Sequence, residues 1–159
     1  MEDILRLLEK NSKLTAEQIA VMLDKDPDAV AAAIKSFEKD EIILGYGALI
    51  NWEKTMKEYV TAFIELKITP QLGEGFDKIA KKIYQYDMVK TVYLMSGGFD
   101  LAVFIEGRTL KEVALFVSEK LAPMDTVIAT ATHFVLKKYK DNGVIFDHVP
   151  SDERRVISL

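Results

Sequence analysis

The sequence predicts an α+β fold in two parts, a helical part followed by a part of mixed strands and helices. Apolar residues recur at helical spacing through residues 2–41, whereas strict alternation and helical spacing take turns from residue 59 onward. A length of 159 residues with 49% hydrophobic content is enough for two small cores. We expect domains over residues 1–53 and 54–142 and a tail over residues 143–159.

The first two predicted helices are short and have readable boundaries. Apolar residues one turn apart mark a helix over residues 2–10. A second helix begins after Thr15, because Thr15 and Gln18 have the spacing of a capping box, in which each side chain binds the other residue's backbone N–H group. The expected inward residues are Ile4, Leu5 and Leu8 in the first helix and Ile19 and Leu23 in the second.

The third helix is predicted to begin at Asp26-Pro27. Aspartate caps free backbone N–H groups at a helix start, and proline fits the first helical position without losing a hydrogen bond. Val30, Ile34 and Phe37 then form its inward stripe. Two helices separated only by residues 25–27, with another helix before them, are the arrangement of a helix-turn-helix unit.

After Glu41 the pattern changes to IILGYGALIN, a run of strand-forming residues. Gly45 and Gly47 permit tight turning inside this run. We interpret the run as a wing, which would make the first part a winged helix-turn-helix domain. Residues 51–54 would then be a linker, exposed except for Trp52.

The second part has the order strand, helix, strand, strand, helix, strand. The predicted strands are residues 59–69, 89–96, 101–107 and 126–140, the last running to Asn142-Gly143. The expected inward residues are Phe76, Ile79, Ala80, Ile83 and Tyr84 in the first helix and Leu110, Val113, Ala114 and Val117 in the second. Thr109 caps the second helix, which stops near Pro123. A βαββαβ order predicts a ferredoxin-like unit.

Four segments, taken in order, resemble the leucine-responsive/asparagine-synthase regulator (Lrp/AsnC) family. They are DILRLLEKNSKLTAEQIA, IILGYGALIN, VYLMSGGFDLAVFIEG and THFVLKKYK, which together extend over roughly residues 2–140. The family's central hairpin reads glycine, any residue, aromatic residue, aspartate, and Gly97-Gly98-Phe99-Asp100 matches it. The resemblance implies a domain that binds double-stranded DNA and a second domain that binds a small effector, expected to be an amino acid, between subunits near this hairpin. It also implies homodimers formed through the sheets that assemble further to a tetramer or octamer.

By this resemblance the third helix corresponds to the family's recognition helix. Related sequences tend to carry several arginines there, the residues that make the commonest specific contact with guanine, whereas the basic residues here are Lys35 and Lys39. Small side chains at Ala31, Ala32 and Ser36 would allow close approach to the duplex and contact with thymine methyl groups.

The charge of the N-terminal part opposes strong binding to DNA. Residues 1–53 carry six basic and eleven acidic residues, a net charge of −5, whereas the remainder carries +1. Neutralisation of phosphates supplies most of a protein's affinity for DNA. We therefore expect weak binding that gains from avidity in an oligomer.

Gly97, Gly98, Phe99 and Asp100 admit two interpretations. As a hairpin turn, glycine supplies positive φ and aspartate binds nearby backbone N–H groups. By the family resemblance, the same residues bind the effector. Asp100 would then hold the α-amino group of an amino acid, while the N–H groups of the glycine turn hold its carboxylate.

The last strand contains further candidates. Thr130 and Thr132 share one face of the sheet and are either strand-forming residues or hydroxyls that line the effector site. His133 points to the opposite face, where packing or an interface is the expected role.

The end of the chain is basic and then apolar. Lys137, Lys138 and Lys140 are expected to form a solvated edge that discourages pairing between sheets. Val156, Ile157 and Leu159 suggest that the tail docks on a neighbour, and His148 lies in this tail.

Composition excludes several kinds of site. Without cysteine there is no disulfide, thiolate nucleophile or sulfur-ligated zinc, and two histidines leave little with which to build a metal site. We expect neither metal nor cofactor. The sequence has no apolar run of the roughly 18 residues that cross a bilayer and no N-terminal pattern of a secretory signal. We therefore expect a cytoplasmic protein without a membrane partner.

Three functions follow from these patterns. The first is a ligand-responsive DNA-binding transcriptional regulator without catalytic chemistry. The second is an amino-acid-binding oligomer whose winged helix has lost affinity for DNA and serves protein contacts. The third is an enzyme, because siroheme decarboxylases share this architecture, but their histidine-rich run corresponds here to GGFDLAVF. The first is the preferred hypothesis.

Overall fold

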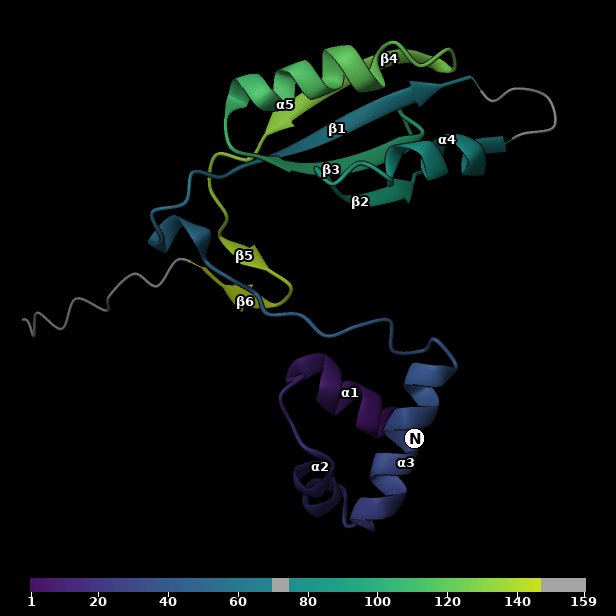
Figure 1. Cartoon of the computed structure of the whole chain (residues 1–159), viewed down its shortest axis with the longest axis vertical. Helices are drawn as coiled ribbons and strands as arrows, with labels where there is room; N and C mark the ends of the chain where they lie inside the picture. The colour runs from purple at the N-terminus through teal and green to yellow at the C-terminus, as the bar shows by residue number, and fades with distance from the viewer. Residues whose placement is uncertain (70–74, 147–159) are drawn as a thin grey trace, which may run out of the picture. The chain divides into compact units, whose positions relative to one another are not determined.

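A computed structural model of the chain describes residues 1–69 and 75–146. The chain divides into two compact units, residues 1–50 and a second unit that begins at Asn51 (Figure 1). Among the described residues, no helix has the length and apolar character needed to cross a membrane.

The N-terminal unit contains the three predicted helices, α1 (Glu2–Lys10), α2 (Ala16–Leu23) and α3 (Pro27–Lys39). Both bonds of the capping box form at the start of α2, because the Thr15 oxygen accepts from the Gln18 N–H and the Gln18 oxygen accepts from the Thr15 N–H. The Asp26 carboxylate accepts from the Ala29 N–H at 2.9 Å and begins α3. The start signals of α2 and α3 are therefore confirmed.

The core of this unit lies between the three helices. Its buried residues are Ile4, Leu8, Ile19, Ala20, Val30 and Phe37. Ile34, Leu5 and Leu23 are half-buried against it, so the predicted inward stripes are confirmed.

The segment that the sequence suggests as a wing, residues 42–50, forms no strand in the structure. Its first residues close α3 instead, because the N–H groups of Ile42 and Ile43 both donate to the Phe37 carbonyl, at 2.9 and 3.0 Å. Glu41 permits this reversal with a φ of +56°. The expected wing strands are therefore absent from this segment, and apolar side chains such as Leu44 are exposed.

The second unit is built on a four-stranded antiparallel sheet in the order β2-β3-β1-β4 (Figure 1). Its strands are β1 (Val60–Ile68), β2 (Val89–Leu94), β3 (Leu101–Gly107) and β4 (Val127–Phe134). The central strands β1 and β3 each have two neighbours, whereas β2 and β4 are edges. With the two helices, this is the predicted ferredoxin-like βαββαβ unit.

Helices α4 (Gly75–Ile83) and α5 (Leu110–Phe116) cover one face of this sheet. Their buried residues join those of β1 and β3 in one core, and a π turn, η2 (Val117–Leu121), continues α5. The predicted stripe of α5 is partly wrong, because Leu110 and Ala114 are exposed while Phe116 is buried. Packing against the sheet rotates α5 so that Val113, Phe116 and Val117 face inward.

The last strand is shorter than predicted. β4 ends at Phe134, and the chain then forms a small hairpin of β5 (Lys140–Asp141) and β6 (Val144–Ile145). Asn142 and Gly143 turn this hairpin with φ values of +44° and +80°, as an Asn-Gly pair does in a tight turn. His148 and the tail residues Val156, Ile157 and Leu159 lie outside the described residues.

Ile19→Ala should destabilise the N-terminal unit by about 2–5 kcal/mol, because Ile19 is fully buried among the three helices and its loss leaves a cavity. Val21→Ala on the same helix is the matched control, since Val21 is 84% exposed and its loss should change stability by less than about 0.5 kcal/mol. Hydrogen exchange should show lost protection in residues 1–50 alone. An equal loss in the sheet of the second unit would contradict two independent cores.

Candidate functional site

The predicted DNA-contact residues lie mainly on one exposed face of α3. Ala32, Lys35, Ser36 and Lys39 are exposed at helical spacing, opposite the buried Val30 and Phe37. Ala31 is half-buried at the border of this face. The helix therefore brings four of the five predicted residues onto one surface.

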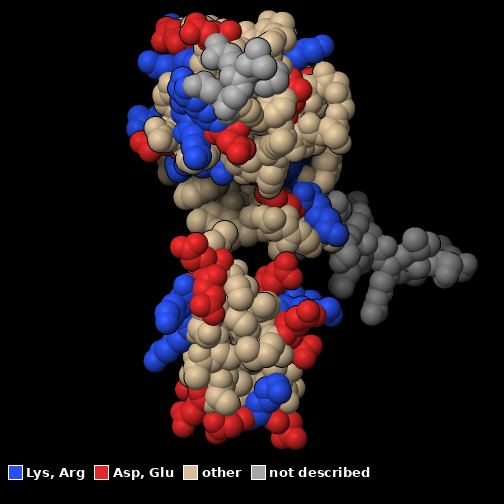
Figure 2. Space-filling view, turned by 90° about the vertical axis from the view of Figure 1, so that its right-hand side faces the viewer, with Lys and Arg blue, Asp and Glu red and all other residues tan. Residues whose placement is uncertain are grey.

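Acidic groups interrupt this surface. The Ser36 hydroxyl donates to the Asp40 carboxylate at 3.0 Å, and Glu38 accepts from the Tyr46 hydroxyl at 2.8 Å. That bond to Glu38 is the main reason why the pKa of Tyr46 is raised. On the face of this unit in Figure 2, acidic side chains lie beside basic ones. The exposed face of α3 thus carries two lysines with acidic side chains close to them.

The central hairpin is anchored to the end of β1 through Asp100. The Asp100 carboxylate accepts from the Ile68 N–H at 2.7 Å, and its backbone N–H donates to the Leu66 carbonyl at 2.9 Å. Its carbonyl accepts from the Met95 N–H at 2.8 Å and closes the loop. Gly97 has a φ of +147°, which favours glycine at this position. Asp100 therefore has the structural role that the turn interpretation predicts.

Phe99 extends this loop over the face of the sheet that the helices leave open. Its ring contacts Phe63 of β1 edge to face, with centroids 5.7 Å apart. Phe63 in turn stacks on Phe104 of β3 at 5.1 Å and on His133 of β4 at 5.5 Å. The Nε2 atom of His133 lies 3.2 Å from a Glu65 carboxylate oxygen on the same face. Side chains from three strands thus form an aromatic surface beside the hairpin, which we call the open face.

Thr130 and Thr132 lie on the other face. They pair in register with Leu66 and Ile64, whose side chains are fully buried under the helices. Both threonines are half-buried there. The structure therefore brings Gly97, Gly98, Phe99 and Asp100 together in one loop, and separates the two threonines from the surface that Phe99 contacts.

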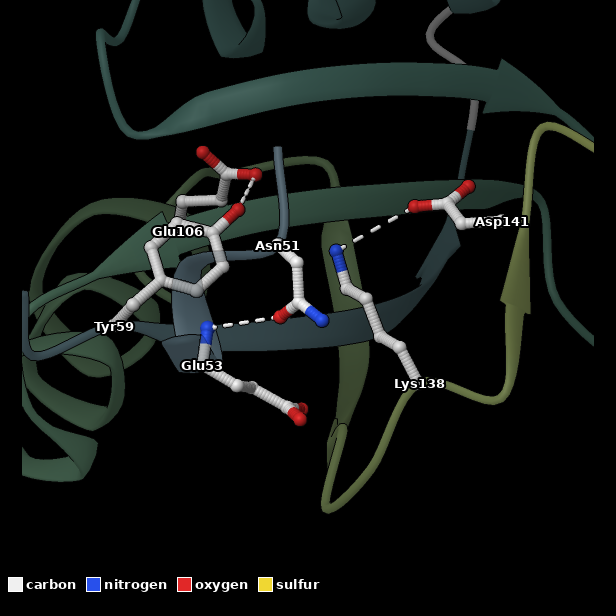
Figure 3. Close-up of polar contacts among 6 residues, drawn as sticks. All are labelled: Asn51, Glu53, Tyr59, Glu106, Lys138 and Asp141. Atoms are coloured by element: carbon white, nitrogen blue, oxygen red, sulfur yellow. Dashed lines mark hydrogen bonds and ion pairs between the residues drawn. The ribbon is translucent and has the colours of Figure 1, made fainter. Parts of the chain in front are cut away.

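A second cluster, which sequence patterns did not reveal, lies at the start of β1 (Figure 3). The Tyr59 hydroxyl donates to the Glu106 carboxylate of β3, and the Nζ atom of Lys138 lies 3.6 Å from an Asp141 carboxylate oxygen. The ring centroids of Trp52 and Tyr59 lie 6.3 Å apart. Tyr59 and Glu106 are far apart in the chain, so only the register of β1 with β3 brings them together. Trp52, an apolar residue in a polar segment, is the sequence feature that points to this cluster.

Two family models match the chain. Residues 2–43 match a winged helix-turn-helix DNA-binding model, and residues 61–145, more than half of the chain, match the Lrp/AsnC ligand binding domain. The chain belongs to the Lrp/AsnC family. Its two units thus correspond to the DNA-binding and ligand-binding parts of an Lrp/AsnC transcriptional regulator.

Individual Lrp/AsnC proteins resemble the chain along its length. The HTH-type transcriptional regulator YugG of Bacillus subtilis is 45% identical over 157 residues, which span 98% of this chain and 95% of YugG. A transcriptional regulator of Neisseria meningitidis in complex with L-methionine has a TM-score of 0.73 at 22% identity, covering 92% of this chain and 94% of its own. A feast or famine regulatory protein of Mycobacterium tuberculosis, also complexed with L-methionine, has a TM-score of 0.73 at 17% identity, covering 94% and 96%. These two structures share the fold of this chain.

Tyr59 should ionise at a higher pH than an ordinary tyrosine. Burial, as the larger cause, and the hydrogen bond to Glu106 raise its pKa from 10.0 to about 12. The folded state holds this proton more tightly than the unfolded chain. The stability that follows is complete below pH 10 and is lost as the pH rises towards 12. Thermal unfolding should therefore depend less on pH in this range for Tyr59→Phe than for the parent. Tyr93→Phe, at an exposed tyrosine of the same sheet, is the control and should behave like the parent.

Proposed function

We propose that this Lrp/AsnC regulator contacts double-stranded DNA with the exposed face of α3 and responds to an amino acid bound at its central hairpin. The observation that carries the proposal is the pairing of an exposed α3 surface with an Lrp/AsnC ligand-binding domain in one chain. Lys35 and Lys39 would contact phosphates. Ala32 and Ser36, with Ala31 at the border, would lie against the bases.

The strength of this contact depends on charge. Two lysines per α3 neutralise few phosphates, and Asp40 beside Ser36 repels them. A single dimer would therefore bind weakly, and several dimers on one DNA would bind well, because linked contacts raise the effective concentration of each subunit. This argument supports a regulator that acts as an assembly.

The acidic N-terminal unit also supports a second candidate function, in which the winged helix serves protein contacts. Val21 and Met22 on α2 are 84% and 57% exposed, and apolar side chains of this kind suit a protein partner. In this alternative the chain is an amino-acid-binding oligomer without affinity for DNA. Measurement of DNA binding decides between the two.

The effector site that we propose consists of Gly97, Gly98, Phe99 and Asp100, without Thr130 and Thr132, which lie on the helix-covered face of the sheet. The two structural neighbours in complex with L-methionine support an amino acid as the effector. A carboxylate of Asp100 keeps lone pairs beyond the one that binds Ile68, so it can also accept from an α-amino group.

We also propose that the open face pairs with that of a second copy, giving a homodimer that assembles to a tetramer or octamer. Phe63, Phe99 and Phe104 form a contiguous aromatic surface there, and such surfaces mark interfaces. The protein that we propose acts without catalysing a reaction and works in the cytoplasm.

Lys35→Glu should remove binding to the chain's own upstream DNA without disturbing the fold, because Lys35 is exposed on α3. Lys10→Glu, at the end of α1, makes the same charge change away from α3 and should retain binding. Fluorescence anisotropy at several salt concentrations measures both. Log affinity should fall by about 0.9 per phosphate neutralised for each decade of salt, so the parent should show a shallow slope. If Lys35→Glu binds as tightly as the parent, α3 is not the reading element.

Asp100→Asn should lose the amino-acid response and keep the fold, because the amide oxygen still accepts from Ile68 while the negative charge is gone. Asp100→Ala should in addition lose about 1–3 kcal/mol of stability, since the Ile68 N–H is left without an acceptor. A thermal-shift screen of the twenty amino acids, including L-methionine, measures the response. A saturating effector at a hundred times its Kd adds about 2.7 kcal/mol to the parent. An unchanged response in Asp100→Asn would leave Asp100 as a turn residue only.

A further inference from the structure

The exposed side of α4 is a basic surface on the helix-covered face of the sheet. Ile79 and Ile83 of this helix are buried in the core of the second unit. Lys78, Lys81 and Lys82 are exposed and lie three or four residues apart, so they share one side of α4, which we call the α4 basic face. A second copy that covers the open face would leave this side of α4 uncovered, because α4 lies on the other face of the sheet (Figure 1).

The charge of α4 contrasts with the charge of α3. Three lysines of α4 stand against one acidic residue, Asp77, in its first turn. Two lysines of α3 stand against two acidic residues, and Asp40 and Glu41 follow this helix directly. Because neutralisation of phosphates supplies most of a protein's affinity for DNA, α4 meets the electrostatic requirement better than the predicted reading helix does.

The spacing of these lysines suits a repeating polyanion. Lys78 and Lys82 are four residues apart, and like charges at this spacing repel each other on a helix. A phosphate oxygen between the two ammonium groups would offset this repulsion. Lysine is a compact point charge on a flexible stem, so it contacts phosphates without a shaped pocket and without reading bases. The partner that fits the α4 basic face is therefore a nucleic-acid backbone.

We propose that the α4 basic face contacts the phosphate backbone of duplex DNA, independently of sequence and in addition to the contact of α3. This inference rests on the proposed function, in which the same chain binds duplex DNA. Residues 1–53 carry a net charge of −5, so phosphate contacts elsewhere in the chain would add the affinity that the N-terminal unit lacks. In this arrangement α4 supplies affinity and α3 supplies sequence preference.

Fluorescence anisotropy of the full chain tests this contact, with its upstream DNA and a scrambled duplex of equal length, at several salt concentrations. Lys81→Glu/Lys82→Glu should weaken binding to both duplexes about tenfold or more and lower the salt slope by about 2, roughly one for each lysine. Lys111→Glu/Lys120→Glu, on α5 and its extension, makes the same charge change at exposed lysines. Each of these control lysines is next to a glutamate in the chain, so this variant should bind like the parent.

Lysines in the last turn of a helix also stabilise it through its dipole, and Lys81 and Lys82 lie in the last turn of α4. Thermal unfolding and sedimentation velocity separate this role from DNA contact. A lower melting temperature with unchanged DNA binding would overturn the proposal. Loss of assembly in the α4 variant would also overturn it, because α4 would then be an interface between copies. Lys81→Gln/Lys82→Gln removes the charge without adding repulsion and should lower the salt slope as well.

The results distinguish the α4 contact from the proposed role of α3. If Lys35→Glu loses DNA while the α4 variant binds like the parent, the α4 contact is wrong and the role of α3 stands. If the α4 variant loses DNA while Lys35→Glu binds like the parent, α3 is not the reading element and the α4 contact stands. A parent that binds neither duplex contradicts both. Equal weakening by the α4 and α5 double variants overturns the α4 contact, since overall charge would then explain the loss.

Discussion

The sheet of the C-terminal unit has helices on only one of its faces, and the rest of this unit depends on that asymmetry. The helix-covered face buries residues such as Ile64 and Ile105 and contains the core. The other face is left with Phe63, Phe104 and His133, an aromatic surface in place of a second layer of helices. Antiparallel sheets tolerate one solvated face when it is polar, but an aromatic one favours a partner. Assembly is therefore a consequence of how the core is built.

The same asymmetry positions the proposed effector site of this unit. The hairpin lies at one end of the open face, where Asp100 ties it to β1 and Phe99 touches Phe63. Two copies that pair through the open face would hold the hairpin beside the interface, so effector binding and assembly would be coupled. Such coupling would let avidity in the assembly compensate for the weak DNA affinity of each acidic DNA-binding unit.

Local signals in the sequence predicted most elements of this fold, and tertiary packing decided the rest. The capping box at Thr15 and the alternation along β1 act over a few residues, so they can be read directly. The end of α3 could not be read directly from the sequence. The backbone hydrogen bonds of Ile42 and Ile43 to the Phe37 carbonyl form in a segment whose composition also suits a wing. The rotation of α5 likewise depends on the sheet beneath it. The aromatic open face and the Tyr59–Glu106 contact require the register of distant strands, which alternation alone does not give.

Sedimentation velocity at micromolar concentration tests the central claim, that the open face drives assembly. The parent chain should sediment as a dimer or larger species. Phe63→Glu should give a folded monomer, because Phe63 lies at the centre of the open face and outside the core. Val21→Glu, on an exposed site of α2, is the control and should assemble like the parent. A parent chain that sediments as a monomer would contradict the account, as would an oligomer that Phe63→Glu leaves intact.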